Sequence, residues 1–221
     1  MSDTYSSTAR PRRSLRAALL AIPLAAGILG ATVTSAQAAT APGPASLTCQ
    51  GAGVDPAAKV RYRTETLIKA PLSTIWKLQT DVARWPSWQQ EVVTTAKRLD
   101  QGPFRTHSQF RWTSQVPPNP ASPPGTLVIT STVQQVRHDK CIRWTGPADS
   151  EGLHIDGVHV WNFTEVRGGV LVRTEETHTG PQVDANVPLA TQFLADGLEA
   201  WLKALKTTAE AGPFGTSAGR R

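Results

Sequence analysis

The residues best suited to acid–base chemistry in this sequence are His159, Glu176 and His178. Imidazole and carboxylate groups gain and lose protons, so a converging set of them can take a proton from a bound molecule and return it. Each of the three lies in a run with the character of a β-strand. We therefore predict His159, Glu176 and His178 as the candidate catalytic residues.

Whether these side chains meet depends on how their two strands pair. A two-residue turn at Gly168-Gly169 is predicted. Counting back from it gives the pairs Arg167–Val170, Phe163–Thr174, Trp161–Glu176 and His159–His178. Opposed residues share a face, so the predicted inner face carries His159, Trp161, Phe163, Val172, Thr174, Glu176 and His178. A slip of one residue would turn Glu176 and His178 outward, where such pairs are ordinary surface contacts.

Two histidines and a carboxylate are also a set of groups that can bind a transition metal. The spacing of these three residues, however, matches no known metal-binding motif. We therefore predict no metal ion and no cofactor.

Aromatic residues recur on the segments that flank this polar group, and the chain has seven tryptophans. A wall of aromatic side chains with a few polar anchors favours a flat or hydrophobic guest. The predicted ligand-binding residues are Trp85, Trp88, Phe110, Trp112, Trp144, Trp161, Phe163, Thr174, Phe193 and Trp201. The alternative is that these large rings simply fill the core. Trp85 and Trp88 flank Pro86 in a turn, where they act either as a lid over the sheet edge or as a gate.

One long C-terminal helix is predicted from a broad apolar stripe. The stripe comprises Leu189, Phe193, Leu194, Gly197, Leu198, Trp201, Leu202 and Leu205. Pro188 suits the first turn of this helix, and Gly212-Pro213 suits its end. Such a stripe must be buried, and the large apolar surface open to it is one face of a sheet.

The remaining pattern predicts an antiparallel meander. A strand at 61–68 ends at Ala70-Pro71, and a short helix at 72–78 and an irregular turn at 85–88 follow. Six further strands are predicted at 92–99, 108–116, 127–136, 141–145, 153–165 and 170–179, with a turn at Gly146-Pro147. Short links between consecutive strands indicate antiparallel pairing. The predicted fold class is therefore α+β, with a curved antiparallel sheet of about seven strands wrapped around the C-terminal helix and two short helices after the first strand.

Residues 1–38 predict an export signal. An apolar run at 17–31 follows four basic residues, Arg10, Arg12, Arg13 and Arg16. Ala36-Gln37-Ala38 suits a cleavage site, and the run is too short for a stable membrane span. Arg12-Arg13 fits a twin-arginine signal, and a general secretory signal is the alternative. We therefore predict an exported protein, secreted or held in the cell envelope, that has no stable membrane span after cleavage.

Removal of residues 1–38 takes four arginines and one aspartate from a formal net charge of +6, which leaves +3. A charge this small and scattered offers no basic stripe for a phosphate backbone, so nucleic acid is excluded as a partner. We predict a flexible arm at 39–58, one domain at 59–212 and a disordered tail at 213–221.

Two cysteines remain after the signal, Cys49 and Cys141. In an oxidising compartment they are predicted to form a disulfide bond that ties the arm to the sheet. Two buried thiols are the alternative.

Several runs of residues resemble the SRPBCC superfamily, which includes START-type lipid-transfer domains, pollen-allergen-type carriers and aromatic polyketide cyclases. They include Ala70-Pro71, Ile75-Trp76, Trp85-Pro86-Ser87-Trp88, Phe110-Arg111-Trp112, Ile142-Arg143-Trp144, His159-Val160-Trp161-Asn162-Phe163, Thr174-Glu175-Glu176 and Trp201-Leu202-Lys203. The resemblance spans roughly residues 62–211 and is strongest to the branch labelled polyketide cyclase/dehydrase and lipid transport. It implies a helix-grip fold with a cavity between the sheet and the long helix, but one such scaffold hosts many activities.

Three functions follow as hypotheses. The first is an exported binding protein or carrier for a small hydrophobic or aromatic molecule held between the sheet and the C-terminal helix. The second is a polyketide cyclase/dehydrase-like enzyme in which Glu176 or a histidine removes a proton while aromatic walls hold the substrate. The third is an interaction module without a ligand. The sequence leaves the ligand and the oligomeric state open.

Overall fold

The computed structural model describes residues 45–116 and 124–212. All of them belong to the compact unit that spans Pro42–Arg221. The predicted export signal at 1–38 and the predicted tail at 213–221 lie outside the described residues. No helix within the two described ranges is long and apolar enough to span a membrane.

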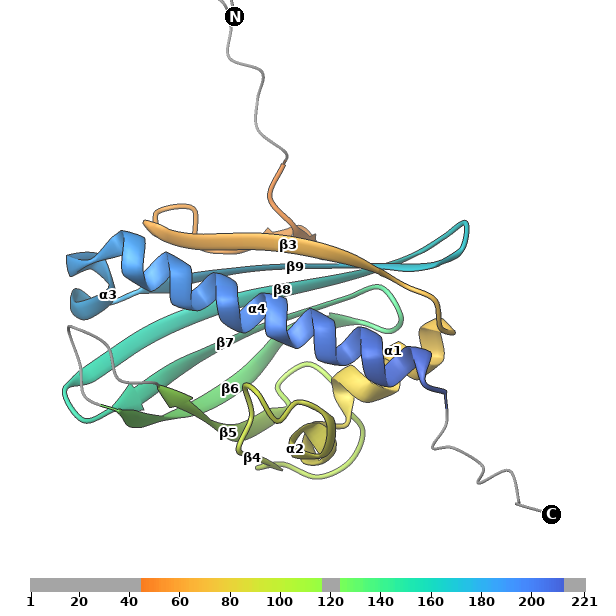
Figure 1. The fold of residues 1–221 in the computed structure, drawn as a ribbon, viewed down its shortest axis with the longest axis horizontal. Helices are drawn as coiled ribbons and strands as arrows, with labels where there is room; N and C mark the ends of the chain where they lie inside the picture. The colour runs from red at the N-terminus through yellow and green to blue at the C-terminus, as the bar shows by residue number, and fades with distance from the viewer. Residues whose placement is uncertain (1–44, 117–123, 213–221) are drawn as a thin grey trace, which may run out of the picture. The chain divides into compact units, whose positions relative to one another are not determined.

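A seven-stranded antiparallel sheet forms the framework (Figure 1). Its strands are β3 (Val60–Ile68), β4 (Thr95–Arg98), β5 (Gln109–Val116), β6 (Gly125–Arg137), β7 (Cys141–Ser150), β8 (Leu153–Val166) and β9 (Gly169–Thr179). Strands β4 to β9 follow one another as a meander, and β3 pairs with β9 at the far edge. Together with the C-terminal helix and the short helices, this sheet confirms the predicted fold class.

Strand β7 is longer than predicted, because it continues through Gly146 and Pro147 instead of turning there. The glycine is explained by a neighbouring strand. A Cβ atom on Gly146 would lie 2.7 Å from the Thr130 carbonyl oxygen of β6, which is too close for any other residue. Gly146 therefore permits a close approach of two strands and does not form a turn.

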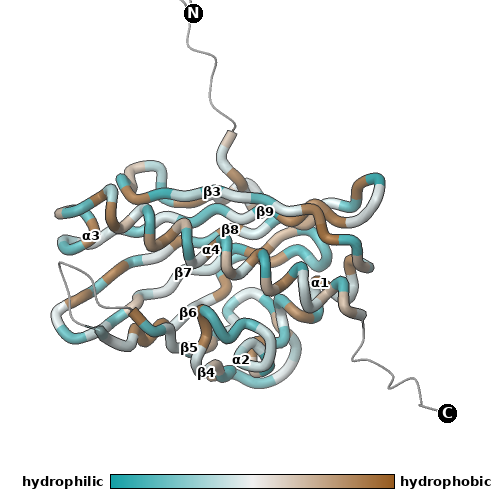
Figure 2. The backbone as a smooth tube through the Cα atoms, in the orientation of Figure 1, coloured by the Kyte–Doolittle hydropathy of each residue, from teal (hydrophilic) through white to brown (hydrophobic). Residues whose placement is uncertain are grey.

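The helices are α1 (Leu72–Thr80), a 3₁₀ turn η1 (Val82–Arg84), α2 (Trp85–Trp88), α3 (Pro181–Ala185) and α4 (Val187–Glu210). Pro188 lies in the first turn of α4, and the Asn186 side chain caps the helix by accepting from the Leu189 amide. Hydrophobic and hydrophilic segments alternate along α4 in Figure 2. The buried positions are Leu194, Leu198, Trp201, Leu202, Leu205 and Ala209. The C-terminal part of the predicted stripe is therefore covered, whereas Phe193 is exposed and Leu189 and Gly197 are only partly buried. Sequence patterns did not predict α3.

Helix α4 runs across the inner face of the sheet, with one flank fastened to the β3 edge (Figure 1). Tyr62 of β3 donates a hydrogen bond to Glu199 at 3.0 Å. Nearer the C-terminal end, Lys206 donates to the Leu67 carbonyl oxygen, and Glu210 accepts from the Lys69 amide at 2.8 Å. These contacts leave the opposite flank of α4 to face the rest of the sheet.

The outer face of the sheet is covered at its centre by an N-terminal strap, residues 45–55, which contains β1 (Thr48–Cys49) and β2 (Ala52–Gly53). Leu47 and Val54 are buried against Val160 of β8. A disulfide bond joins Cys49 to Cys141, with the two Cα atoms 5.4 Å apart. The described part of the segment expected as a flexible arm is therefore fixed to the sheet, because its apolar residues cover an apolar strand.

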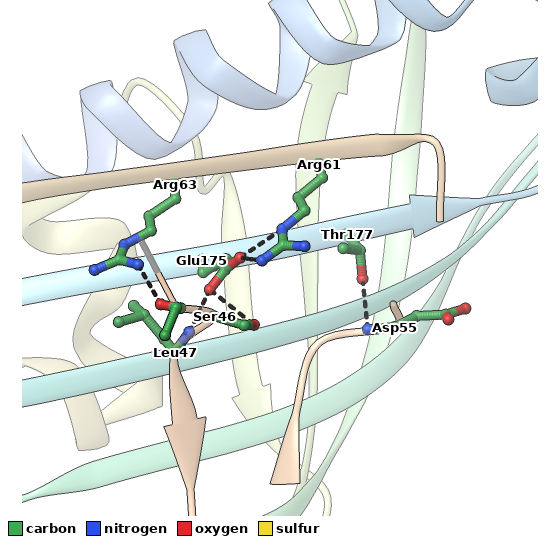
Figure 3. Close-up of polar contacts among 8 residues, drawn as sticks. Ser46, Leu47, Asp55, Arg61, Arg63, Glu175 and Thr177 are labelled. Carbon is green, nitrogen blue, oxygen red and sulfur yellow. Dashed lines mark hydrogen bonds and ion pairs between the residues drawn. The ribbon is translucent and has the colours of Figure 1, made fainter. Parts of the chain in front are cut away.

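Glu175 fastens the strap from the sheet side (Figure 3). Its carboxylate is fully buried and accepts hydrogen bonds from the Leu47 amide at 2.5 Å and the Ser46 hydroxyl at 3.2 Å. The Arg61 guanidinium pairs with the other carboxylate oxygen. A buried carboxylate is tolerated when its charge and lone pairs are satisfied in this way. Further contacts join Arg63 to the Ala45 carbonyl oxygen and the Asp55 amide to Thr177.

Removing the disulfide tests how much the strap contributes to stability. The Cys49→Ser/Cys141→Ser variant should have a free energy of unfolding lower by about 4 kcal/mol, because the bond closes a long loop of the unfolded chain. The two cysteines are separated by 92 residues. Urea unfolding followed by tryptophan fluorescence measures the difference. The Ser46→Ala variant, which loses one hydrogen bond of the strap, should change stability by only about 1 kcal/mol. An unchanged urea midpoint in the double variant would contradict this assignment.

Candidate functional site

Most of the predicted aromatic wall forms one cluster on the inner face of the sheet. We define the aromatic cluster as Trp85, Phe110, Trp112, Trp144, Trp161 and Trp201. Several of the rings meet edge to face, with centroid distances of 4.9 Å for Trp85–Trp201 and 5.6 Å for Phe110–Trp144, and Trp161 meets its neighbours at tilted angles. Such geometry is that of rings in direct contact. The rings predicted to line a hollow therefore pack against one another, and the middle of the interior is filled.

The other predicted wall residues lie around this cluster. Trp88 contacts Trp201 with centroids 6.3 Å apart, and Thr174 is fully buried on β9. Phe163 is buried against Trp76, at a centroid distance of 5.4 Å. Phe193 of α4 is 37% exposed and lies on the surface of the helix.

An open groove of about 240 Å³ lies beside the cluster, on the outside of α4. Its lining residues are Trp88, Glu91, Lys203, Ala204, Thr207 and Thr208. Trp88 is the single predicted wall residue in this lining. The groove is thus a different place from the hollow expected between the sheet and α4.

Gln79 of α1 positions the cluster, and sequence reasoning missed it. Its side-chain oxygen accepts from the Trp201 indole at 3.1 Å, and its backbone oxygen accepts from the Trp85 indole at 3.2 Å. Gln79 is fully buried, and it follows Ile75 and Trp76 at helical spacing. That spacing on an otherwise apolar helix face is the signal that could have identified it.

The pairing of β8 with β9 differs from the prediction by two residues. Val166 lies opposite Gly169, so the turn is Arg167-Gly168, and His159 lies opposite Glu176. Trp161 lies opposite Thr174, and Gly157 lies opposite His178. A shift of two residues keeps every side chain on its face, so all residues predicted to point inward do so.

Gly169 explains the shift. A Cβ atom at this position would lie 2.2 Å from the Ile68 carbonyl oxygen of β3. Glycine is required here because β3 approaches closely, and Gly169 consequently begins β9 and is not a turn residue.

The predicted acid–base residues are brought together on the inner face. Glu176 Oε2 lies 3.1 Å from His159 Nδ1, and Glu176 Oε1 lies 3.3 Å from His178 Nε2. The other ring nitrogen of His159 lies 2.6 Å from the Thr174 hydroxyl. The side chain of His159 is 5% exposed, whereas those of Glu176 and His178 are 18% and 22% exposed. The hydrogen-bonded group therefore extends from the buried Thr174 hydroxyl, through His159, to the partly exposed side chains of Glu176 and His178.

This polar group is continuous with the aromatic cluster. The His159 ring centroid is 4.8 Å from that of Trp161 and 5.0 Å from that of Trp144. A ligand that contacts Glu176 would therefore lie beside aromatic surface.

Burial and charge set the protonation of the group. Burial lowers the pKa of His159 from 6.5 to about 4, so its imidazole is neutral at pH 7. Burial alone would raise the pKa of Glu176, but the neighbouring imidazoles of His159 and His178 outweigh it and lower that pKa. The geometry then assigns the Nδ1 proton of His159 to the bond with Glu176, and the Thr174 hydroxyl donates to Nε2.

A floor of small residues lies next to the group. We define the small-residue floor as Ser131, Gly146 and Gly157, which adjoin one another on the inner face of β6, β7 and β8. Gly146 and Gly157 lie opposite each other on β7 and β8, and both are partly exposed. A Cβ atom on Gly157 would lie 3.5 Å from Glu176 Oε1 and 3.8 Å from the His178 ring. A glycine inside a strand often marks a place where another molecule or backbone comes close.

Trp112 closes one side of this floor, because its indole donates to the Ser131 hydroxyl at 3.3 Å. In the described parts of the chain, no set of three His, Cys, Asp or Glu side chains is arranged to hold a metal ion. The arrangement thus offers a carboxylate, aromatic edges and bare backbone.

Comparison with known families gives a match over most of the chain. The family described as polyketide cyclase/dehydrase and lipid transport matches residues 38–210. No curated protein sequence matches the chain significantly.

Solved structures share the fold at low sequence identity. A START superfamily protein from Mycobacterium smegmatis has 14% identity and a TM-score of 0.54, covering 68% of this chain and 97% of that chain. The hypothetical protein jhp0584 from Helicobacter pylori has 15% identity and a TM-score of 0.54, covering 77% and 99%. Major latex-like protein 151 from Panax ginseng has 10% identity and a TM-score of 0.51, covering 67% and 96%.

These likenesses show a START-like fold, in agreement with the seven-stranded sheet and the long helix α4. The family match extends over the same elements. The chain therefore belongs to the polyketide cyclase/dehydrase and lipid transport family, within the START/SRPBCC superfamily.

Proposed function

We propose that this protein is an exported carrier or binding protein for a small, largely hydrophobic or aromatic molecule. The observation that carries this proposal is the small-residue floor at Gly146 and Gly157, which lies beside Glu176 on one side and aromatic side chains on the other. Bare backbone beside apolar walls and one polar anchor is what a small apolar ligand requires. Membership of a family whose description includes lipid transport supports the same function.

The proposed ligand lies over the floor and not within the aromatic cluster. The cluster rings are in contact with one another and all except Trp112 are buried, so a ligand placed among them would have to separate buried rings. The floor, by contrast, is partly exposed at both glycines. In this arrangement Trp112, which is partly exposed, supplies apolar contact, and Glu176 supplies a polar anchor.

The disulfide bond between Cys49 and Cys141 supports a location outside the cytoplasm. Disulfide bonds persist in oxidising compartments and are rare where thiols are kept reduced. The export signal read from residues 1–38 agrees with that location.

A neutral apolar dye tests the binding site. N-phenyl-1-naphthylamine should bind the wild-type protein with an increase in fluorescence, whereas the Gly157→Ala variant should bind it at least about fivefold more weakly. The added methyl group would stand 3.5 Å from Glu176 Oε1, on the floor itself. Native mass spectrometry of protein purified from its own source should also detect a bound small molecule.

The matched control is Gly197→Ala on α4, where an added methyl group meets no atom within 4 Å. This variant should bind the dye like the wild type and be more stable, by up to about 1 kcal/mol, because alanine favours a helix more than glycine does. Equal dye binding in wild-type and Gly157→Ala protein would remove the floor from the site. Absence of dye binding and of any co-purified molecule would count against a carrier.

The neutral state of His159 makes stability depend on pH. Below pH 6.5 the unfolded chain binds a proton on this histidine, but the folded protein binds it only near pH 4. The free energy of unfolding should therefore fall as the pH decreases, by about 2 kcal/mol between pH 6.5 and pH 5. Urea unfolding at about pH 7 and pH 5 measures this loss. The loss should be smaller in the His159→Gln variant, and an equal loss in both proteins would contradict the assignment.

The export proposal is tested by the mature N-terminus. Protein recovered from the culture medium or the cell envelope should begin near Ala39, after the Ala36-Gln37-Ala38 signal. Intact-mass measurement and N-terminal sequencing determine this directly. Replacement of Arg12 and Arg13 by lysine distinguishes the two routes, because it should block twin-arginine export and leave general secretion working. Recovery of the uncleaved chain in the cytoplasm would overturn the proposed location.

A further inference from the structure

Glu176 presents an unsatisfied acceptor toward the floor. Each carboxylate oxygen has one imidazole partner, His159 for Oε2 and His178 for Oε1. A carboxylate offers about four lone-pair sites, so each oxygen can accept a further hydrogen bond. Of the two carboxylate oxygens, Oε1 is the one nearer to the position that a Cβ atom would take on Gly157, at 3.5 Å, with the Gly146 carbonyl oxygen 3.3 Å from the same position. A ligand resting on the floor therefore meets an acceptor.

Among the described residues, Glu176 has imidazole partners but no lysine or arginine partner. No lysine or arginine in residues 45–116 and 124–212 forms an ion pair with this carboxylate. Arg61 lies on β3, the strand next to β9, but it points to the outer face and pairs with Glu175. His159 is neutral at pH 7, because burial lowers its pKa to about 4. The site therefore presents a negative acceptor and no fixed cation to a ligand.

We propose that the site selects ligands whose polar group donates a hydrogen bond to Glu176, such as an aromatic or alicyclic alcohol, and rejects ligands that carry a carboxylate. The inference rests on the proposed function, since it names the ligand class of the same site. A hydroxyl group satisfies the free lone pair of Oε1. A second carboxylate would bring a like charge into a partly desolvated place beside apolar rings, which is unfavourable.

Three naphthalene probes that differ in one substituent test the selection. The probes are 2-methylnaphthalene, 2-naphthalenemethanol and 2-naphthoate, and equilibrium dialysis near pH 7 measures their binding. The alcohol should bind about tenfold more tightly than the methyl compound, as expected for a hydrogen bond to a charged group. The carboxylate should bind at least about tenfold more weakly than the methyl compound. The methyl compound reports apolar binding alone.

The Glu176→Gln variant removes the charge and keeps the size of the side chain. In this variant the preference for the alcohol over 2-naphthoate should fall by at least about tenfold, while binding of 2-methylnaphthalene stays within about twofold. Glu65→Gln, at an exposed position on the outer face of β3, is the matched control and should change none of the three affinities. The wild-type series is decisive by itself if Glu176→Gln does not fold.

The outcomes separate this inference from the proposed function. Binding of 2-methylnaphthalene with no gain for the alcohol, or with equal or tighter binding of 2-naphthoate, would overturn the inference and leave a carrier of apolar molecules. Failure of 2-methylnaphthalene and the alcohol to bind would overturn both.

Discussion

The antiparallel pairing of β8 with β9 determines where the charged groups in the middle of the sheet lie. Successive residues of a strand point to opposite faces, so Glu175 and Glu176 are separated by the sheet although they are neighbours in the chain. Glu175 is buried on the outer face beneath the N-terminal strap, and Glu176 faces inward beside His159. Both carboxylates belong to β9, so a slip of that strand by one residue would exchange their environments and lose both sets of partners.

The two faces of the sheet consequently differ in what covers them. The strap covers the centre of the outer face and is held there by a disulfide bond, an ion pair of Glu175 and apolar contacts. On the inner face, the aromatic cluster and the stripe of α4 bury apolar surface, which stabilises the fold in proportion to the area removed from water. Gly157 and the partly exposed Glu176 contribute little of that burial. The fold tolerates the small-residue floor because the aromatic cluster on the same face and the strap on the opposite face supply stabilising contacts.

Strand periodicity predicted which side chains face inward, but not which ones touch. The inward set of β8 and β9 was correct because a two-residue shift preserves the face, whereas the pairs themselves depend on Gly169, whose role comes from the distant Ile68. For the same reason the disulfide bond of the strap was predicted but its other contacts were not, since Leu47 meets Glu175 across 128 residues. The contacts between the rings could not be predicted either. Periodicity shows that Trp144 and Phe110 point inward, but it does not show whether free space separates them.

The hydrogen bonds of His159 make this histidine unsuited to act as a general base. A general base must reach the proton that it removes, either directly or through one water. Both ring nitrogens of His159 are engaged within the protein, one with Glu176 and the other with Thr174. The imidazole therefore has no free nitrogen for a substrate, and its part is to orient Glu176. Glu176 can accept a hydrogen bond over the floor, but the imidazoles that lower its pKa also make it a weaker base. A carboxylate held in this way is suited to anchoring a ligand's hydroxyl group.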